Sequence, residues 1–185
     1  MMKIAVIGAG SWGAKLIRTF ERNDVCSLLW VVDLDTSALD RVQARYPSLR
    51  CTQEIEEALQ DPEVDALVIA TPAATHYTIG RKAIAQGKHL FVEKPLTTSS
   101  SEAQDLLTRA QSAGLTLMVG HVYLHNPAVE AVGEAIDAGE IGPLRYLSMT
   151  RTHQGPVRSD VGVAWDLASH DISILLRWLK ADPLK

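Results

Sequence analysis

Cysteine is scarce in this chain of 185 residues, which contains only Cys26 and Cys51. The two lie far apart, and neither belongs to a C-x-x-C pair. Such spacing predicts neither a disulfide scaffold nor a zinc site, and we expect no bound metal. Sparse, unpaired cysteines are typical of a reducing compartment, so we expect a cytoplasmic protein.

Long apolar runs and clusters of basic residues are also missing. No apolar run reaches the roughly 18 residues of a membrane-spanning helix, so we expect no membrane partner. Residues 1–14 resemble a signal peptide, but glycines interrupt their apolar run, and a buried first strand explains them better. The 18 basic and 22 acidic side chains give a net charge of −4 without a Lys/Arg block, which argues against a nucleic-acid partner.

The sequence does contain a repeated alternation of short apolar runs with longer amphipathic segments, which is the pattern of βαβ units around a parallel sheet. Hydrophobic residues make up 46% of the chain, enough for a packed core. We therefore expect an α/β fold, a Rossmann doubly wound parallel sheet, over residues 1–120. Its strands are predicted at residues 3–8, 28–33, 49–52, 66–70, 89–93 and 116–120. Its helices are predicted at residues 11–22, 36–46, 54–60, 75–86 and 100–113.

The pattern changes after Gly120. A partly alternating strand there suits an antiparallel sheet with one solvated face. Residues 121–185 are therefore predicted to begin a second, α+β unit that stays incomplete. In order, the sequence predicts a helix, a strand, a polar loop and a helix at residues 127–138, 144–152, 153–162 and 165–179.

A glycine-rich loop follows the first predicted strand. Gly8, Gly10 and Gly13 form a G-x-G-x-x-G pattern, with Ser11 and Trp12 between the last two. The first glycine permits a tight turn, the second lets the backbone approach a pyrophosphate, and the third lets helix and strand pack closely. Because a predicted helix follows, we interpret the loop as the phosphate-binding part of a dinucleotide site. A tight turn without a ligand is the alternative.

Asp33 ends the second predicted strand, twenty residues after Gly13, where a carboxylate accepts hydrogen bonds from the adenosine ribose hydroxyls. The same carboxylate would repel a 2′-phosphate, and residues 34–36 offer no basic side chain to neutralise one. NAD is therefore favoured over NADP as the cofactor. A methyltransferase also places an acid after its second strand, so these residues leave the reaction open.

Two further groups bear on the reaction. Glu93, Lys94 and a proline end the fifth predicted strand, and catalytic groups in open α/β sheets gather at the carboxyl ends of strands. Asp166 and His170 lie four residues apart, so on a helix they share one face and suit general acid–base catalysis. The alternatives are a solvated Lys94 and an ordinary polar pair on a solvated helix face.

Several short motifs follow one another along nearly the whole chain. They are Ala70-Thr71-Pro72 with His76, Gly87-Lys88-His89, Glu93-Lys94-Pro95, Val119-Gly120-His121 with Asn126-Pro127, Gly139 to Pro143, and Trp165-Asp166 with His170-Asp171. Together they resemble the glucose–fructose oxidoreductase and inositol dehydrogenase (Gfo/Idh/MocA) family.

The resemblance implies an NAD(P)-dependent oxidoreductase that transfers a hydride between nicotinamide and a hydroxyl carbon of a sugar, cyclitol or nucleotide sugar. It assigns catalysis to three residues: His170 removes the hydroxyl proton, Lys94 hydrogen-bonds the reacting oxygen, and Asp166 orients the site. For His76 a packing role at the start of a helix is the equal alternative. Cofactor contacts are implied at Thr71, Pro72, His76, Glu93 and Lys94.

Residues 121–127 and 158–160 look most like family members encoded with surface-polysaccharide synthesis, which act on nucleotide-activated amino sugars or their uronic acids. By that resemblance Arg151 and Arg158 would bind a carboxylate or phosphate. Solvated loop arginines are the alternative. Substrate contacts are expected from Lys94, His121, Arg158 and His170.

The second half of the chain departs from the family. Family members continue with an open, mostly antiparallel sheet that covers the substrate and usually forms the subunit interface, whereas this sequence stops just after the helix with His170. We expect residues 121–185 to be the truncated beginning of that substrate and dimerisation domain, and a homo-oligomer once the domain is complete. A reduced family member that uses a partner protein in place of the missing sheet is the alternative. The alternative function is a non-catalytic dinucleotide-binding fragment or an NAD(H)-sensing module.

Overall fold

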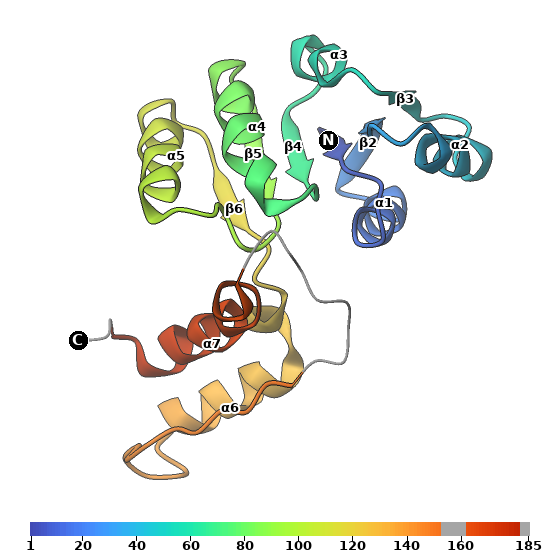
Figure 1. The fold of residues 1–185 in the computed structure, drawn as a ribbon. Coiled ribbons are helices and arrows are strands. Elements are labelled where there is room, and N and C mark those ends of the chain that lie inside the picture. Colours follow the sequence, from blue (N-terminus) through green and yellow to red (C-terminus); the bar gives the residue numbers. More distant parts are fainter. Residues whose placement is uncertain (153–161, 182–185) are drawn as a thin grey trace. The chain divides into compact units, whose positions relative to one another are not determined.

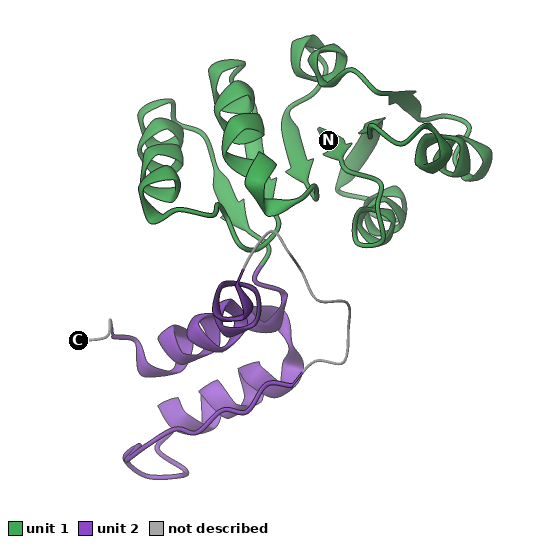
Figure 2. Cartoon of the chain, in the orientation of Figure 1, with its two compact units in different colours: residues 1–120 green, residues 121–185 purple. Residues whose placement is uncertain are grey.

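The structure is a computed structural model, and it describes residues 1–152 and 162–181. The chain divides into two compact units, residues 1–120 and residues 121–185 (Figure 2). Within the described residues, no helix is long and apolar enough to cross a membrane. In the same part of the chain, no group of three or more His, Cys, Asp or Glu side chains is placed to hold a metal ion.

Six parallel strands form the sheet of the first unit, in the order β3-β2-β1-β4-β5-β6 (Figure 1). The chain starts at the centre of the sheet, builds outward to β3 and returns to the other side of β1 with β4. In doubly wound sheets, ligands bind beyond the carboxyl ends of the strands where the order reverses, here between β1 and β4. The strands are β1 (Met2–Ile7), β2 (Cys26–Val32), β3 (Arg50–Thr52), β4 (Ala66–Ile69), β5 (His89–Val92) and β6 (Leu117–Val119).

Helices cover both faces of this sheet, and each face has its own apolar core. On one face α3, α4 and α5 pack against strand residues such as Leu67 and Val92. On the other face α1 and α2 pack against residues such as Val6 and Val31. Because both faces are covered, the strands are continuously apolar, and all four residues of β4 are buried. The helices are α1 (Gly13–Glu21), α2 (Thr36–Arg45), α3 (Ile55–Gln60), α4 (Ala73–Ala85) and α5 (Ser100–Ser112).

Local signals set the ends of these helices. Asp35 caps α2, because its side chain accepts the N–H of Ser37 at 2.9 Å. Gly87 follows α4 with φ of +70°, a left-handed conformation that glycine adopts without strain. Both ends agree with the sequence prediction.

The second unit is built from helical segments and an extended stretch. The indole N–H of Trp178 donates to the carbonyl oxygen of Val129 at 3.0 Å, which joins α7 to α6. The Lys180 ammonium lies 2.7 Å from the Asp137 carboxylate at the ends of the same two helices. The segments are a 3₁₀ turn η1 (Val122–His125), α6 (Pro127–Asp137), a π-helical turn η2 (Ala164–Ala168) and α7 (Ser169–Leu179).

The predicted Rossmann sheet is confirmed, and its helices and strands lie within two residues of the predicted bounds. The predicted strand over residues 144–152 is wrong, because these residues form no strand. A strand needs a neighbour for its backbone hydrogen bonds, and the described residues of the second unit contain no other strand. The predicted helix over 165–179 is a π-helical turn followed by α7. Apart from Gly162, the predicted polar loop lies outside the described residues.

Candidate functional site

Close packing around the loop between β1 and α1 requires glycine at two of its positions. Gly8 has φ of +101°, and a Cβ atom there would lie 2.8 Å from the carbonyl oxygen of Ala70, just after β4. A Cβ atom on Gly13 would overlap the carbonyl oxygen of Gly8. The loop therefore lies tightly against the carboxyl ends of β1 and β4, at the point where the strand order reverses.

Gly10 differs from these two glycines, because among the described residues no atom beyond its chain neighbours lies within 4 Å of the position that a Cβ atom would take. The protein's own packing does not require glycine here, so the open backbone is available to a ligand. Beside it, the N–H groups of Ser11, Trp12 and Gly13 donate no backbone hydrogen bond within the described part of the chain. Open backbone and unused N–H groups at a helix N-terminus fit the pyrophosphate of a dinucleotide.

Asp33 follows β2 and is hydrogen-bonded to the glycine-rich loop. Its Oδ2 atom accepts the N–H of Ala9 at 2.5 Å, and its Oδ1 atom accepts the N–H of Asp35 at 2.8 Å. Each carboxylate oxygen has a further lone pair, so the half-buried group can also accept hydrogen bonds from ribose hydroxyls. Asp33 therefore fixes the glycine-rich loop, a role that the sequence did not predict, while its predicted bonds to ribose hydroxyls stay a prediction.

Glu93 lies directly after β5 and is 8% exposed. Its Oε1 atom has no hydrogen-bond partner among the described residues, and a Cβ atom on Gly120 would lie 2.9 Å from it. Burial raises the pKa of Glu93, and the charges on Lys94 and His76 act in the opposite direction. A buried acceptor without a partner fits a donor on the nicotinamide half of a dinucleotide.

The remaining predicted residues of the first unit follow β4 and β5. Lys94 is half-buried, and the peptide bond from it to Pro95 is cis. The hydroxyl of Thr71 lies 2.7 Å from the hydroxyl of Thr75, and exposed Pro72 precedes α4. His76 is buried, and each of its ring nitrogens contacts a backbone carbonyl oxygen. Thr71, Pro72 and Lys94 thus follow the carboxyl ends of neighbouring parallel strands, whereas His76 lies in α4.

In the second unit, His170 contacts Tyr123, which in turn contacts an ion pair between Arg151 and Asp171. The buried His170 ring packs edge-on against the Tyr123 ring, with 4.7 Å between their centroids. The Arg151 guanidinium lies 4.5 Å from the centroid of the Tyr123 ring and donates to Oδ1 of Asp171 at 2.7 Å. Hydrogen bonding to Asp171 raises the pKa of Arg151. Arg151, which we expected to face a substrate anion, is thus paired within the unit. Tyr123 was not among the predicted site residues. The acidic Asp171, next to the predicted catalytic His170, was the sequence feature that could have indicated a partner for Arg151.

Three other predicted residues lie in the same half of the chain. Asp166 lies in the π-helical turn η2, immediately before α7. The Nδ1 atom of His121 is buried without a hydrogen-bond partner among the described residues, and burial lowers the pKa of its imidazole. Arg158 lies outside the described residues. The catalytic grouping of Lys94 with Asp166 and His170 draws on both units and stays a prediction.

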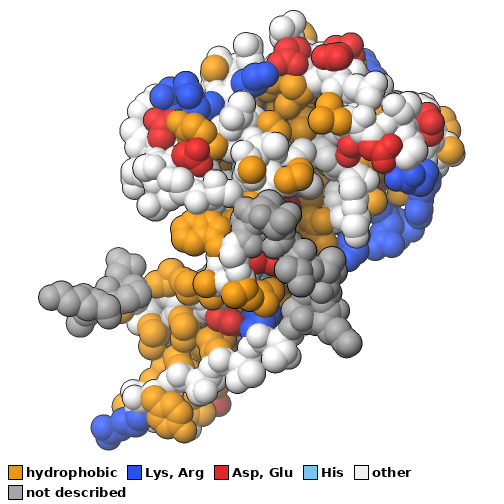
Figure 3. Space-filling model, in the orientation of Figure 1, with side chains coloured by type: hydrophobic (Ala, Val, Ile, Leu, Met, Phe, Trp, Pro, Cys, Tyr) orange, Lys and Arg blue, Asp and Glu red, His pale blue; other side chains and the backbone are white. Residues whose placement is uncertain are grey.

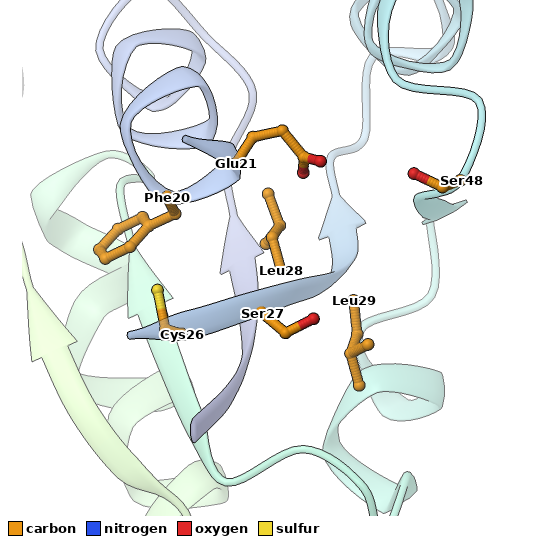
Figure 4. Close-up of a pocket in the computed structure, with 7 residues that line it drawn as sticks. All are labelled: Phe20, Glu21, Cys26, Ser27, Leu28, Leu29 and Ser48. Carbon is orange, nitrogen blue, oxygen red and sulfur yellow. The ribbon is translucent and has the colours of Figure 1, made fainter. Parts of the chain in front are cut away.

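A surface hollow of about 280 Å³ lies elsewhere in the first unit (Figure 4). Phe20, Cys26, Leu28 and Ser48 contribute to its walls. It adjoins the amino-terminal half of β2, whereas Asp33 follows the carboxyl end of that strand. The hollow is therefore not part of the candidate site.

Known proteins are similar to this chain over nearly its whole length. The model of an oxidoreductase family with an NAD-binding Rossmann fold, Gfo/Idh/MocA, matches residues 2–121. Scyllo-inositol 2-dehydrogenase (NAD(+)) of Bacillus subtilis strain 168 is 37% identical over 189 residues, with 98% of this chain and 55% of the relative covered. UDP-N-acetylglucosamine 3-dehydrogenase of Acidithiobacillus ferrooxidans is 32% identical over 184 residues, with coverage of 99% and 56%.

A solved structure similar to this one contains the nucleotide. GenD2 from gentamicin A biosynthesis, in complex with NAD, has a TM-score of 0.83 at 28% identity, over 96% of this chain and 53% of that one. The chain spans about half the length of the curated relatives it matches. The region matched by the family model includes the glycine-rich loop, Asp33 and Lys94.

Proposed function

The chain belongs to the Gfo/Idh/MocA oxidoreductase family with an NAD-binding Rossmann fold, and from this premise we propose that it carries the cofactor site and part of the catalytic group of an NAD-dependent dehydrogenase. The reaction is hydride transfer at a hydroxyl carbon of a sugar, cyclitol or nucleotide sugar, a class that includes the compounds in the names of the relatives. One observation carries the proposal: the glycine-rich loop, Asp33 and Lys94 all follow parallel strands at the same edge of one sheet.

The residues that would hold NAD are those whose free donors and acceptors fit it. The N–H groups of Ser11, Trp12 and Gly13 would bind the pyrophosphate, and Asp33 would accept the ribose hydroxyls. The Asp33 carboxylate disfavours the 2′-phosphate of NADP through charge repulsion. The unused Oε1 atom of Glu93 would accept a donor from the nicotinamide half. When bound, NAD would supply the nicotinamide ring that accepts the hydride and its two electrons.

Lys94 and the second unit supply the acid–base groups in this proposal. The Lys94 ammonium donates a hydrogen bond to the reacting oxygen and stabilises the negative charge that develops on it. A ring nitrogen of His170 takes the hydroxyl proton, and packing against Tyr123 limits the orientations of the ring. Asp166 precedes His170 by one helical turn and orients it.

Absorbance of NADH tests the reaction directly. We expect the full chain to reduce NAD⁺ with at least one member of a panel that contains scyllo-inositol, other cyclitols, UDP-N-acetylglucosamine and its uronic acid. Lys94→Ala should lower the rate by about 100-fold or more, since a donor to a developing oxyanion is lost. The same variant should keep its NADH affinity. Lys82→Ala, at an exposed surface ion pair with Glu56, is the matched lysine control and should leave both quantities unchanged.

The outcome separates two functions. Reduction that survives in Lys94→Ala would show that the lysine is not catalytic. Tight NADH binding with no reduction of NAD⁺ by any member of the panel would reject catalysis by this chain. That result would favour a nucleotide-binding or NAD(H)-sensing module instead. On the cysteine usage and the family resemblance we also propose a cytoplasmic location, and a homo-oligomer for a protein with the complete second domain.

A further inference from the structure

We propose that His76 is a buried, doubly protonated imidazolium that holds the loop carrying Lys94 against the loop after β4. Its Nδ1 atom lies 3.0 Å from the carbonyl oxygen of Pro95, and its Nε2 atom lies 2.8 Å from the carbonyl oxygen of Thr71. Pro95 directly follows Lys94, and Thr71 follows β4. One ring in α4 therefore contacts both loops of the candidate site in the first unit.

The chemistry of the two contacts fixes the charge of the ring. A carbonyl oxygen can only accept a hydrogen bond, whereas a neutral imidazole has one N–H and one lone pair. A neutral ring would therefore direct the lone pair of one nitrogen at a carbonyl oxygen. The His76 side chain is 1% exposed, and both contacts are direct, so no water can relieve such a clash. Only the imidazolium donates to both carbonyl groups.

A buried cation also needs compensation, and the acidic group whose charge interacts with that of His76 is Glu93, directly after β5. Glu93 is 8% exposed, and the charges of Lys94 and His76 both act to lower the pKa of its carboxyl group while burial raises it. Burial of a charge is tolerated when an opposite charge and hydrogen bonds compensate for lost water. The ring thus contacts two carbonyl oxygens, and the charges of His76 and Lys94 both act on the Glu93 carboxyl group.

A second histidine in the same unit, His89, has an accepting ring nitrogen and serves as an internal reference for the protonation of His76. The Nδ1 atom of His89 accepts the N–H of Thr116 at 3.0 Å. An accepting nitrogen carries no proton, so His89 is neutral with its proton on Nε2. The two histidines therefore have different protonation patterns within one sheet.

The consequence for catalysis rests on the proposed function. His76 is a positioning residue for Lys94, because it holds the carbonyl group of the neighbouring Pro95 and contacts no substrate itself. With both ring nitrogens occupied by carbonyl groups, it has no N–H or lone pair left for a direct hydrogen bond to a cofactor.

Nitrogen NMR of the full, ¹⁵N-labelled chain at pH 7 tests the charge without any substitution. Ring nitrogens are assigned by through-bond correlation to the backbone. We expect both His76 nitrogens to resonate in the protonated range and Nδ1 of His89 in the unprotonated, accepting range. An unprotonated nitrogen on His76 would overturn the proposal. This result does not depend on NADH binding or turnover, so it fails or succeeds separately from the proposed function.

Hydrogen exchange tests the positioning role. In His76→Gln the amide nitrogen can donate to only one of the two carbonyl groups, so one hydrogen bond is lost. We therefore expect the backbone N–H groups of Lys94 and Leu96 to exchange about 10-fold faster, the effect of losing one net hydrogen bond. His89→Gln is the matched control and should leave exchange at these positions unchanged. A folded His76→Gln variant with the parent's exchange at Lys94 and Leu96 would contradict the positioning role. If that variant does not fold, the NMR of the unsubstituted chain still decides the protonation of His76.

Discussion

The two units bury their apolar side chains very differently. In the first unit every helix contributes to one of two cores, and side chains such as Ala5, Leu67 and Val92 have no exposed surface. In the second unit the buried residues, among those that the structure describes, are His170, Ser173 and Ile174. Hydrophobic burial is the main favourable contribution to folding, so the first unit is held by its own core.

The second unit instead exposes large apolar side chains. Tyr146 is 83% exposed, Ile172 51% and Leu179 48%. Apolar side chains gather over this unit in the space-filling view, whereas the visible face of the first unit mixes them with charged groups (Figure 3). The proposed nucleotide site therefore lies in a unit with its own buried core, whereas His170 lies in a unit with few buried side chains among the described residues.

The largest expected effect comes from removing a core side chain of the first unit. Leu67→Ala should lower the free energy of unfolding by about 2–5 kcal/mol, because it creates a cavity at a fully buried site. The same change at Leu176, which is 39% exposed in the second unit, should cost less than about 1 kcal/mol. Urea unfolding of both variants measures the difference. Equal losses would contradict the contrast in burial.

A smaller effect is expected at the adenosine end of the cofactor site. Asp33→Asn removes the charge and weakens the bonds to Ala9 and Asp35, so NADH affinity should fall about 10-fold, or about 1.4 kcal/mol. Discrimination against NADPH should fall with it. Asp35→Asn is the matched control, since asparagine also caps a helix well. Calorimetric titration with both nucleotides measures the change, and an unaltered preference for NADH would remove the ribose role of Asp33.

The smallest effect concerns pH and the second unit. Because burial lowers the pKa of His121, the unfolded chain takes up a proton at this residue at a higher pH than the folded chain does. Stability should therefore fall as the pH drops below the ordinary histidine pKa of about 6.5, and level off below the lowered value. His121→Gln should flatten this dependence.

Urea midpoints between pH 8 and pH 5 measure this effect. His125→Gln, at an exposed histidine four residues away, is the matched control and should keep the parent's dependence. If His121→Gln shows the same pH dependence as the parent, the buried imidazole does not contribute to it.

The sequence was most informative where the physical cause is local. Continuous apolar runs predict strands covered on both faces, as in β4, and α4 ends at Ala85, one residue from its predicted end. The helix α2 begins at Thr36, as predicted, directly after its cap Asp35. The positions of Gly8, Gly10 and Gly13 at a strand–helix junction are likewise fixed by spacing alone.

Features that depend on distant parts of the chain could not be predicted. The bond from the Ala9 N–H to Asp33 joins two loops that only the folded sheet brings together. The two contacts of His76 join segments after β4 and β5. The predicted strand over residues 144–152 is wrong for the same reason, since pairing needs a partner that periodicity alone does not supply.

NADH binding by Gly10→Ala tests whether the glycine-rich loop of the first unit forms the nucleotide site. Among the described residues, no atom beyond the chain neighbours lies within 4 Å of the added methyl group, so the variant should unfold at the parent's urea concentration. The methyl group would nonetheless meet a bound pyrophosphate, and affinity should fall by about 10-fold or more. Gly162→Ala, at another glycine with open surroundings, is the matched control and should bind as the parent does. If Gly10→Ala binds NADH as tightly as the parent, the glycine-rich loop is not the phosphate site.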